Sequence, residues 1–285
     1  MQFINHNKPK VSVCVITYNQ ENYIEDCLES LVTQVTSFKY EIIIGEDNST
    51  DNTKLIIQRY QKKYPDIIKP LFNDRNIGAV NNYMKTHLNA SGDYIAHLDG
   101  DDYALPGKLQ AQADYLDQNP ECNIVWHRMQ IKYQDSNILV DDLIRENELS
   151  KKRFVREDIL RYVTIGLHSS KMYRKKLVGI RIPPFPMLDF YVNVEQMSEG
   201  YAHFLESEPL GVYRAGIGFA SADSMGNFLL CKTFKHFAES YPKCRSSIAS
   251  ACLLKAGAAI KNKNWPLVKL FLPLAICNLS AKTFI

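Results

Sequence analysis

Residues 11–34, VSVCVITYNQENYIEDCLESLVTQ, place a run of mostly β-branched residues directly before a segment with helical spacing. The first eight residues are typical of a buried strand. In the remainder, apolar residues recur on one helix face: Ile24, Leu28, Leu31 and Val32. The stretch therefore predicts a strand followed at once by an amphipathic helix.

The same alternation of strand and helix continues to residue 99. YEIIIGED (40–47) and STDNTKLIIQRYQKKY (49–64) repeat it clearly. It recurs more weakly through three further segments: IIKPLF (67–72), IGAVNNYMKTHLNA (77–90) and DYIAHLD (93–99). Strands separated by helices of this length need right-handed crossovers, so the pattern predicts an α/β fold with a mostly parallel sheet covered by helices.

Composition is that of a globular protein, with 285 residues, 46% of them hydrophobic and 23% charged. This length suits one large domain or a domain with an appendage. The seven cysteines show neither a CxxC pair nor zinc-ligand spacing with histidine, so we expect reduced packing residues. No apolar h-region opens the chain and no segment has about 20 uninterrupted apolar residues, which favours a cytoplasmic protein.

Charge is divided unevenly along the chain. Residues 225–285 hold nine Lys or Arg and one acid, Glu239, a net charge of +8. The first 224 residues hold 25 Lys or Arg and 30 Asp or Glu, a net charge of −5. The acidic balance of this larger part argues against binding to nucleic acid.

Polar clusters follow three of the predicted strands: Tyr18-Asn19, Glu46-Asp47 and Asp99 to Asp102. The first two could each be ordinary turn and capping chemistry if taken alone. In a parallel sheet, however, ligands gather at the carboxyl ends of the strands, where loops converge and helix N-termini point their amides. Together the clusters predict one binding site.

The stretch HLDGDDY, residues 97–103, holds three carboxylates in four positions: Asp99, Asp101 and Asp102. Acids this close raise one another's pKa unless a cation neutralises them. A surface acidic loop is the alternative, but the buried-strand pattern before the stretch favours a site. Carboxylate oxygens without a Cys or His cluster select Mg²⁺ or Mn²⁺, and Mg²⁺ is often shared with substrate phosphates. A nucleotide fits, because Tyr18 offers a flat face for a base and Asp47 an acceptor for a ring N–H.

Four segments together carry a family resemblance: VITYNQENYIEDCLESLVTQ (15–34), FKYEIIIGEDNSTDNT (38–53), NIGAVNNY (76–83) and GDYIAHLDGDDYALPGKLQAQADYL (92–116). They resemble the family 2 glycosyltransferases with the GT-A fold, and more narrowly the members that assemble bacterial polysaccharides. The resemblance extends over roughly residues 10 to 220. It implies a Rossmann-like, mostly parallel central sheet flanked by helices.

The resemblance also implies a set of residues that bind a nucleotide sugar: Thr17, Tyr18, Asn19, Glu21, Asp47, Asn76, Gly78, Asn82, Asp99, Asp101 and Arg214. Asp101 and Asp102 would hold Mn²⁺ or Mg²⁺ and the diphosphate, with Asp99 near the ribose or behind the metal. Many members place an arginine where this chain has Asn81. The metal would stabilise, as a Lewis acid, the charge that develops on the departing nucleoside diphosphate.

An inverting transfer needs a base to take the proton of the acceptor hydroxyl. RIPPFPMLDFYVNVEQMSEG (181–200) resembles the family segment that supplies it, and Asp189 is the candidate. Alternatively, Asp189 could serve only as a helix N-cap. Glu195 is a second candidate base, and its alternative is a solvated helix residue. His168 resembles a residue on the acceptor or donor-sugar side, although a lone histidine is more often a core residue.

The resemblance predicts a catalytic domain over 1–224, with a nucleotide-sugar half (1–120) and an acceptor half (121–224), and a basic helical extension over 225–285. Helices are predicted over 228–241, 246–262 and 265–284. The apolar stretch of the last one, about 16 residues broken by Lys269 and two prolines, is short for a bilayer span. Residues 261–285 could contact a membrane surface peripherally, or else cap the domain or form a dimer contact.

These observations predict a metal-dependent, inverting hexosyl- or N-acetylhexosaminyltransferase. It would move a sugar from a UDP-sugar to a hydroxyl of a growing or lipid-linked surface glycan, in the cytoplasm or at the inner face of the membrane. One alternative is an inactive nucleotide-sugar-binding scaffold. Another is a metal-dependent nucleotidyltransferase, which would be expected to have a glycine-rich, basic loop where this chain has TYNQENY. The sequence predicts neither the donor sugar nor the oligomeric state.

Overall fold

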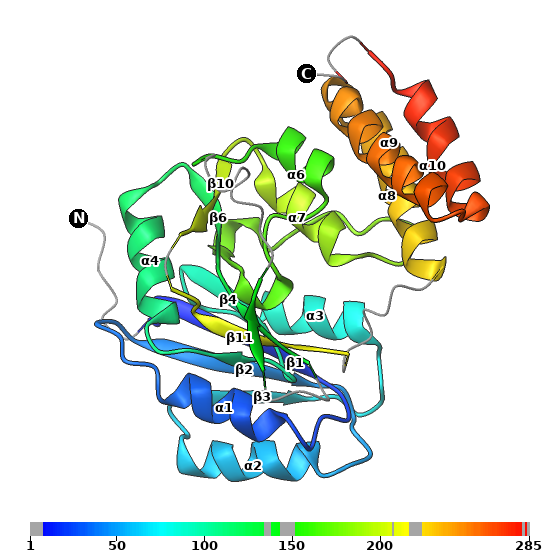
Figure 1. The fold of residues 1–285 in the computed structure, drawn as a ribbon. Helices are drawn as coiled ribbons and strands as arrows, with labels where there is room; N and C mark the ends of the chain where they lie inside the picture. The colour runs from blue at the N-terminus through cyan, green and yellow to red at the C-terminus, as the bar shows by residue number, and fades with distance from the viewer. Residues whose placement is uncertain are drawn as a thin grey trace. The chain divides into compact units, whose positions relative to one another are not determined.

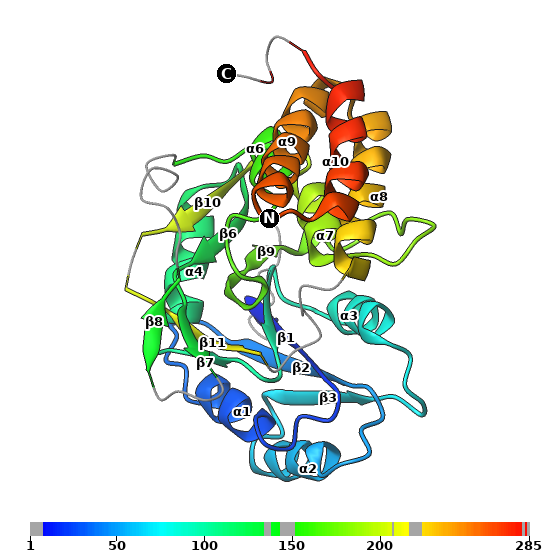
Figure 2. The same ribbon diagram turned by 45° about the vertical axis from the view of Figure 1, so that its right-hand side comes forward.

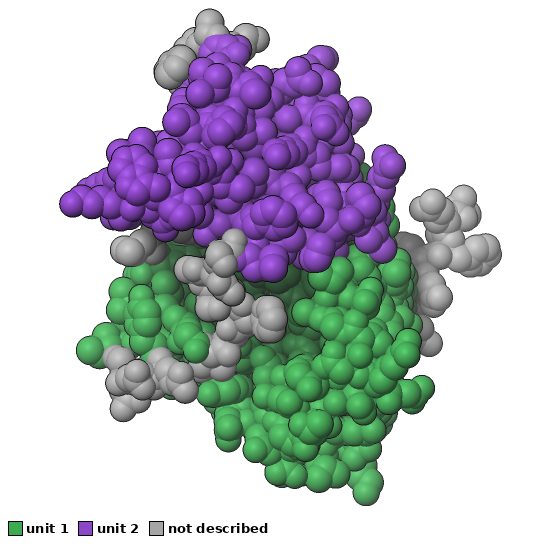
Figure 3. Space-filling model, turned by 90° about the vertical axis from the view of Figure 1, so that its right-hand side faces the viewer, with its two compact units in different colours: residues 1–152, 166–179, 202–218 green, residues 153–165, 180–201, 219–285 purple. Residues whose placement is uncertain are grey.

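The computed structural model describes residues 8–133, 138–142, 152–206, 208–216, 224–280 and 283. The chain forms two compact units (Figure 3). The first comprises residues 1–152, 166–179 and 202–218, and the second comprises 153–165, 180–201 and 219–285. Both β-sheets belong to the first unit, whereas the second unit consists of helices and their connections.

The central sheet of the first unit has seven strands in the order β10-β6-β9-β4-β1-β2-β3 (Figure 1). Their bounds are β1 Val11–Thr17, β2 Tyr40–Glu46, β3 Ile68–Phe72, β4 Tyr94–Asp99, β6 Cys122–His127, β9 Met172–Arg174 and β10 Tyr201–Leu205. Strands β4, β1, β2 and β3 are parallel neighbours, and β9 runs antiparallel to both β4 and β6. The predicted mostly parallel sheet is thus confirmed.

Burial explains the order of these strands. Val11, Val13 and Val15 of β1 are fully buried, as expected for a central strand covered on both faces. Strand β3 lies at the edge of the sheet, where the missing N–H of Pro70 is tolerated. Gly45 in β2 has a packing role, because a Cβ there would lie 2.0 Å from the side chain of Thr86.

Helices cover both faces of this sheet. Helices α1 and α2 lie on one face and α3 packs against β1 and β2 on the other (Figure 1). The bounds in the first unit are α1 Ile24–Val32, α2 Thr53–Lys63, α3 Ala79–Leu88 and α4 Lys108–Gln118, with 3₁₀ turns η1 His168–Ser170 and η2 Lys175–Leu177. The three helices predicted before residue 90 are all present, with ends a few residues shorter than predicted.

A second, four-stranded sheet in the first unit has the order β5-β11-β7-β8 and was not predicted. Its strands are β5 Tyr103–Ala104, β7 Gln130–Tyr133, β8 Leu139–Asp141 and β11 Gly211–Ala215 (Figure 2). Strand β11 pairs with β5, directly after the acidic stretch. This pairing brings a segment more than 100 residues away in sequence to that stretch.

The second unit contains α6 Arg156–Tyr162, α7 Asp189–Met197, α8 Ser224–Ser240, η3 Pro242–Cys244, α9 Arg245–Lys261 and α10 Trp265–Cys277. Its core includes the stacked rings of Tyr191 and Phe237, whose centroids lie 5.0 Å apart. The three predicted C-terminal helices are present, but the last ends at Cys277, and residues 281, 282 and 284 of that prediction lie outside the described residues. The predicted domain division at residue 224 stays a prediction. Within the described ranges, no helix is both long and apolar enough to cross a lipid bilayer.

Candidate functional site at the carboxyl edge of the central sheet

The carboxyl ends of β1, β2 and β4 lie side by side. In the strand register Thr17 is opposite Glu46, and Ile16 is opposite Asp99. The backbone continues this pairing past the strands, since Asp47 N donates to Thr17 O at 3.1 Å and Gly100 N donates to Ile16 O at 3.0 Å. The three polar clusters therefore meet at one edge of the sheet.

Side chains hold the loop after β1 against the loop after β2. Asn19, whose φ is 52°, accepts a hydrogen bond from Thr50 N on its Oδ1 at 2.8 Å. Its own N–H donates to Ser49 Oγ at 3.0 Å. Glu21 Oε2 accepts from Asn52 N at 2.9 Å. Asn19 and Glu21, both predicted to bind the nucleotide sugar, thus position the loops around the site.

Thr17 and Gly100 set the spacing between the first and third clusters. Thr17 Oγ1 donates to Gln20 Oε1 at 2.7 Å. A Cβ on Gly100 would lie 2.5 Å from that Gln20 oxygen, so glycine allows the two loops to touch. Tyr18 between them is 44% exposed, and its ring is accessible for stacking against a base.

Asp47 organises the start of α3. It is buried, and its Oδ1 accepts from Asn73 Nδ2 and Ile77 N, both at 2.9 Å. Its Oδ2 accepts from Gly78 N at 2.9 Å. Gly78 needs to be glycine because its φ is 85°. A base N–H that reached Asp47 would therefore share the carboxylate with these three donors.

The two other predicted residues of this segment differ in exposure. Asn76 is exposed, and its Oδ1 accepts from Gly78 N at 3.0 Å. Asn82 is buried and donates from Nδ2 to Gly45 O at 2.7 Å. Asn82 thus anchors α3 on β2, and Asn76 is the better placed of the two to meet a ligand.

Glu46 is the last residue of β2 and was not predicted as a site residue. One of its two carboxylate oxygens is an unsatisfied acceptor. The residue is fully buried, and its Oε1 accepts from Ser49 N at 2.6 Å. Among the described residues its Oε2 has no hydrogen-bond partner. A buried unpaired oxygen is unfavourable by about 1–3 kcal/mol, so Glu46 Oε2 is an unsatisfied acceptor at the end of β2.

The three carboxylates of the acidic stretch have different partners. Asp102 is fully buried, and its two oxygens accept from Arg214 N at 2.9 Å and Ser169 Oγ at 2.5 Å. Asp99 is partly exposed, and its Oδ1 lies 3.1 Å from His97 Nε2. Asp101 is buried and is hydrogen-bonded by the Gln20 side chain.

These environments make the negative charge unfavourable. Burial raises the pKa of Asp101 to about 6, and the charge of Asp99 contributes to this shift. Burial raises the pKa of Asp102 well above its usual range, with Asp99 and Asp101 adding to the effect. The repulsion expected from the sequence is therefore present, and a bound cation would relieve it.

The chemistry of these oxygen donors fits a hard divalent cation. No group of three His, Cys, Asp or Glu side chains in the described part of the chain forms a protein-only metal cage. Mg²⁺ needs only one or two carboxylates when phosphates supply other ligands. Asp102 has both oxygens engaged by protein donors. The arrangement favours Asp101, with Asp99 beside it, as the metal-binding carboxylate, and Asp102 as the residue that fixes the loop.

The acidic stretch is supported by two buried residues that were not predicted as site residues, Ser169 and Lys108. The single hydroxyl hydrogen of Ser169 goes to Asp102, while its oxygen accepts from Asp99 N at 3.1 Å. Lys108 is fully buried and donates to Ser169 O at 2.5 Å. Burial lowers the pKa of Lys108 to about 8, although Asp102 opposes the shift. The available signal was a lysine in the first turn of a helix that directly follows the acidic stretch.

Arg214 lies beside the acidic stretch, where the resemblance predicted a contact with the diphosphate. Its Nη1 donates to Asp101 O at 2.6 Å, and its Nη2 donates to Asp26 Oδ2 at 2.5 Å. The guanidinium also lies over the rings of Tyr23 and Tyr103, at 5.3 and 4.9 Å. Arg214 is therefore held by several contacts and brings a positive charge to the backbone of the acidic stretch.

A hydrogen-bonded chain runs from Asp99 into the core. Tyr173 hydroxyl lies 2.8 Å from His87 Nδ1, and His87 Nε2 lies 3.0 Å from His97 Nδ1. Burial lowers the pKa of both histidines well below the usual range, so each is neutral with one N–H. An ionised Asp99 can only accept, hence His97 carries its proton on Nε2, His87 also on Nε2, and Tyr173 donates to His87. His168 stacks against this chain, with its ring 4.0 Å from that of His97.

The candidate base lies in the second unit. Asp189 is the first residue of α7, is exposed, and accepts from Phe190 N on Oδ1 at 3.0 Å. Leu188 occupies the N-cap position, so Asp189 is not the cap. Glu195 accepts from the hydroxyl of Tyr241 at 2.9 Å, which favours its structural interpretation.

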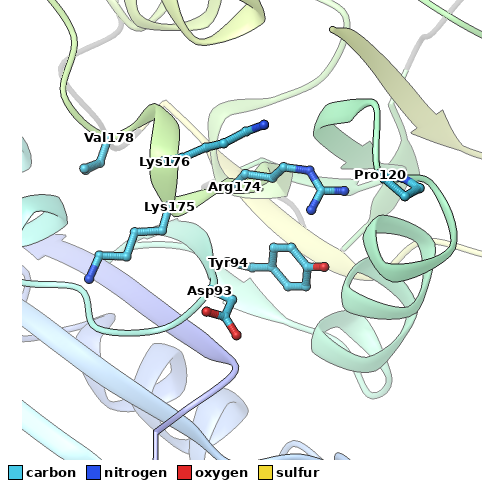
Figure 4. A pocket seen from close by; sticks show the side chains of 7 residues that line it. All are labelled: Asp93, Tyr94, Pro120, Arg174, Lys175, Lys176 and Val178. Atoms are coloured by element: carbon cyan, nitrogen blue, oxygen red, sulfur yellow. The ribbon is translucent and has the colours of Figure 1, made fainter. Parts of the chain in front are cut away.

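A basic recess of about 680 Å³ lies at the opposite edge of the sheet (Figure 4). Tyr94, the first residue of β4, lines it, whereas Asp99 ends that strand at the other edge. Arg174 in this recess donates to Leu116 O at 2.7 Å and Asn119 O at 2.9 Å, which closes the C-terminus of α4. The guanidinium of Arg174 thus has a structural role, because it donates hydrogen bonds to backbone carbonyls.

In α/β proteins, ligands bind outside the carboxyl ends of the parallel strands, which is where this chain has its polar strand ends and clustered carboxylates. The description of the matching family model is "Glycosyl transferase family 2", and the match covers residues 12–179. The chain belongs to this family.

Relatives and solved structures agree with this assignment. A teichuronic acid biosynthesis glycosyltransferase named as putative, TuaG of Bacillus subtilis, is 29% identical over 73% of this chain and 79% of its own length. An uncharacterized protein of Mycobacterium tuberculosis is 34% identical over 72% of the chain. The chain spans only 58% of the length of that relative.

Two solved structures show the same GT-A fold. Staphylococcus aureus TarS in complex with UDP-GlcNAc has a TM-score of 0.65 at 19% identity, covering 85% of this chain and 71% of TarS. The Pyrobaculum calidifontis mannosyltransferase PcManGT, in complex with GDP-Man and Mn²⁺, has a TM-score of 0.57 at 17% identity, covering 97% and 82%. The predicted fold class is confirmed.

Proposed function

We propose that this protein is an inverting glycosyltransferase that uses a UDP-sugar and a divalent cation. The observation that carries the proposal is the meeting of three strand-end clusters at one edge, where burial and the charge of Asp99 make the ionised form of Asp101 unfavourable. Membership of family 2 supports sugar transfer. TarS, solved with UDP-GlcNAc, supports a UDP-sugar, and PcManGT, solved with Mn²⁺, supports the metal.

Binding of the donor follows from the groups at this edge. Tyr18 stacks on the base, and Asp47 accepts a hydrogen bond from the single N–H of uracil. Asp101, with Asp99 beside it, would hold Mn²⁺ or Mg²⁺, and Asp102 keeps the loop in place. When bound, the cation stabilises the negative charge on the departing UDP. Arg214 adds a positive charge at the backbone of the same loop.

Asp189 acts as the base in this proposal. It accepts the proton of the acceptor hydroxyl while that oxygen forms a bond to the anomeric carbon. The bond from this carbon to the diphosphate oxygen breaks on the opposite face, and UDP leaves with the electron pair. Exposure of Asp189 at the start of α7 supports this role, because the carboxylate is accessible.

The acceptor in this proposal is a hydroxyl of a growing or lipid-linked surface glycan, and the donor carries a hexose or N-acetylhexosamine. The name of TuaG, which refers to teichuronic acid biosynthesis, supports a surface glycan.

A thermal-shift screen of UDP- and GDP-sugars with Mn²⁺ tests the donor class, because a ligand that binds only the folded state raises Tm. We expect a UDP-sugar to give the largest shift, and the same compound to release UDP slowly by hydrolysis. A preference for GDP-sugars would contradict the UDP assignment. Binding without any UDP release, even with candidate acceptors, would favour the nucleotide-sugar-binding scaffold.

A further inference from the structure

Helix α10 in the second unit is apolar on two opposite faces. Its inner face buries Val268, Phe271, Leu274 and Ala275. At 100° per residue, the opposite face holds Trp265, Lys269, Leu272, Pro273 and Ile276. The side chains of Trp265 and Ile276 are 59% and 58% exposed. A helix that is apolar on opposite faces is normally covered on both of them. Within the described residues, the outer face of α10 has no such cover.

Further exposed apolar side chains lie on α9 and just after α10. Helix α9 packs alongside α10 (Figure 2), and its Leu254 and Ile260 are 68% and 49% exposed. Leu279, just after α10, is 42% exposed. Single exposed apolar residues are common, but a set on adjacent helices indicates an interaction surface.

The charge around these residues has one sign. Lys261 and Lys263 are exposed in the turn between the helices, and Lys269 is exposed within the outer face of α10. Over residues 225–285 only Glu239 opposes the nine Lys and Arg. We define the α9–α10 surface by these residues: Leu254, Ile260, Lys261, Lys263, Trp265, Lys269, Leu272 and Ile276.

We propose that the α9–α10 surface binds the interfacial region of a lipid bilayer that contains anionic lipids. Lysines meet the headgroups, and Trp265 with Leu272 and Ile276 enters the boundary of the acyl region. Helix α10 has 13 residues, about 20 Å at 1.5 Å per residue, which is shorter than the hydrocarbon core, so it lies in the plane of the membrane. A second copy of the chain fits less well, because it would bring lysines against lysines.

The proposal rests on the second unit alone and does not depend on the donor site. It would place the protein where a lipid-linked acceptor is found. Failure of this proposal and failure of the proposed glycosyl transfer are therefore separable: Mn²⁺-dependent UDP binding, measured on the same variants, reports on the donor site only.

Co-sedimentation of the full chain with vesicles tests the proposal. We expect binding to vesicles of phosphatidylcholine with 30% phosphatidylglycerol to exceed binding to pure phosphatidylcholine at least about tenfold, and to weaken with added salt. Lys269→Glu should weaken it by more than about fivefold, the effect expected for loss of one lysine at the surface. The charge-matched control is Lys62→Glu on α2, an exposed lysine of the first unit. Equal binding to both vesicle types, or equal effects of the two variants, would overturn the proposal.

Tryptophan fluorescence gives a second readout. The chain has two tryptophans, of which Trp126 is fully buried and Trp265 is exposed. Lipids brominated on their acyl chains should quench part of the emission, and Trp265→Phe should remove the quenched part. If light scattering instead finds a dimer that Trp265→Asp dissociates, the surface is a contact between copies and the membrane proposal is wrong.

Discussion

The carboxyl edge of the central sheet and the α9–α10 surface both present groups that the described fold does not satisfy, but of opposite kinds. At the sheet edge, Glu46 Oε2 is buried without a hydrogen-bond partner among the described residues, and burial makes the negative charge of Asp101 unfavourable. On the α9–α10 surface the unsatisfied groups are exposed and apolar, with lysines around them. The kind of group that is left unsatisfied therefore differs between the two places, which is why we propose a cation and a nucleotide at the first and a lipid interface at the second.

The largest effect on the proposed transfer is expected at Asp189, in the second unit. Asp189→Asn removes the base, so kcat should fall by about 10²–10⁴-fold. UDP affinity should stay unchanged, because the donor groups are in the first unit. The matched control is Glu195→Gln on the same helix, since Glu195 accepts from Tyr241. Retention of full kcat by Asp189→Asn would show that another group takes the proton.

The carboxyl edge of the sheet should make stability depend on pH, because it holds buried carboxylates. The residues that define the α9–α10 surface include no acid. The pKa of Asp101, about 6, exceeds the unfolded value of roughly 3.9. The folded state therefore binds more protons between these values, and stability falls as the pH rises through this range. The folded and unfolded pKa values of Asp101 differ by about two units, which corresponds to a change of roughly 3 kcal/mol in the free energy of unfolding.

Thermal unfolding of the metal-free protein at pH 4.5 and pH 7.5 measures this change. We expect Asp101→Asn to raise Tm at pH 7.5 and to reduce the pH dependence, whereas the exposed Asp66→Asn should do neither. A pH dependence that is identical in Asp101→Asn and in the unmodified chain would contradict the assignment of the unfavourable charge to Asp101.

Ser169 tests the support beneath the acidic stretch. Ser169→Ala leaves an oxygen of Asp102 without its donor, so we expect a stability loss of about 1–3 kcal/mol and weaker UDP binding with Mn²⁺. Ser170→Ala is the control, because this neighbouring hydroxyl donates to Leu167 O instead. Denaturant unfolding and calorimetry measure the two effects. Similar losses of UDP affinity in both variants would indicate general damage to the turn.

The smallest effect is expected at the buried end of the hydrogen-bonded chain. Tyr173→Phe removes the donor to His87 and should cost about 1 kcal/mol of stability. In the unmodified chain, ¹⁵N NMR should show both His87 and His97 protonated on Nε2. Protonation of His97 on Nδ1 would contradict the direction of the chain inferred from Asp99.

Much of the first unit could be predicted from the sequence because its strands and helices alternate with clear periodicity. Val11 to Thr17 and Ile24 to Leu31 have the two periods side by side, and both elements are present. The second sheet could not be predicted, since its strands are short and β11 pairs with β5 across more than 100 residues. Periodicity contains no information on such long-range pairing.

The site was predictable in location but not in its inner support. Asp99, Asp101 and Asp102 follow a strand and attract notice through charge density alone. Ser169 and Lys108 reach them only through tertiary contacts, and the place of Lys108 at the start of the next helix was the one local signal. The different roles inferred for Asp101 and Asp102 also depend on tertiary contacts, because protein donors engage both oxygens of Asp102.

Calorimetric titration of UDP with and without Mn²⁺ tests the central claim most directly. The unmodified chain should bind UDP tightly only when Mn²⁺ is present, Asp101→Asn should lose this metal-dependent binding, and Asp66→Asn should keep it. Binding of UDP that is equally strong without Mn²⁺ and unchanged in Asp101→Asn would contradict the assignment of this edge as a metal and diphosphate site.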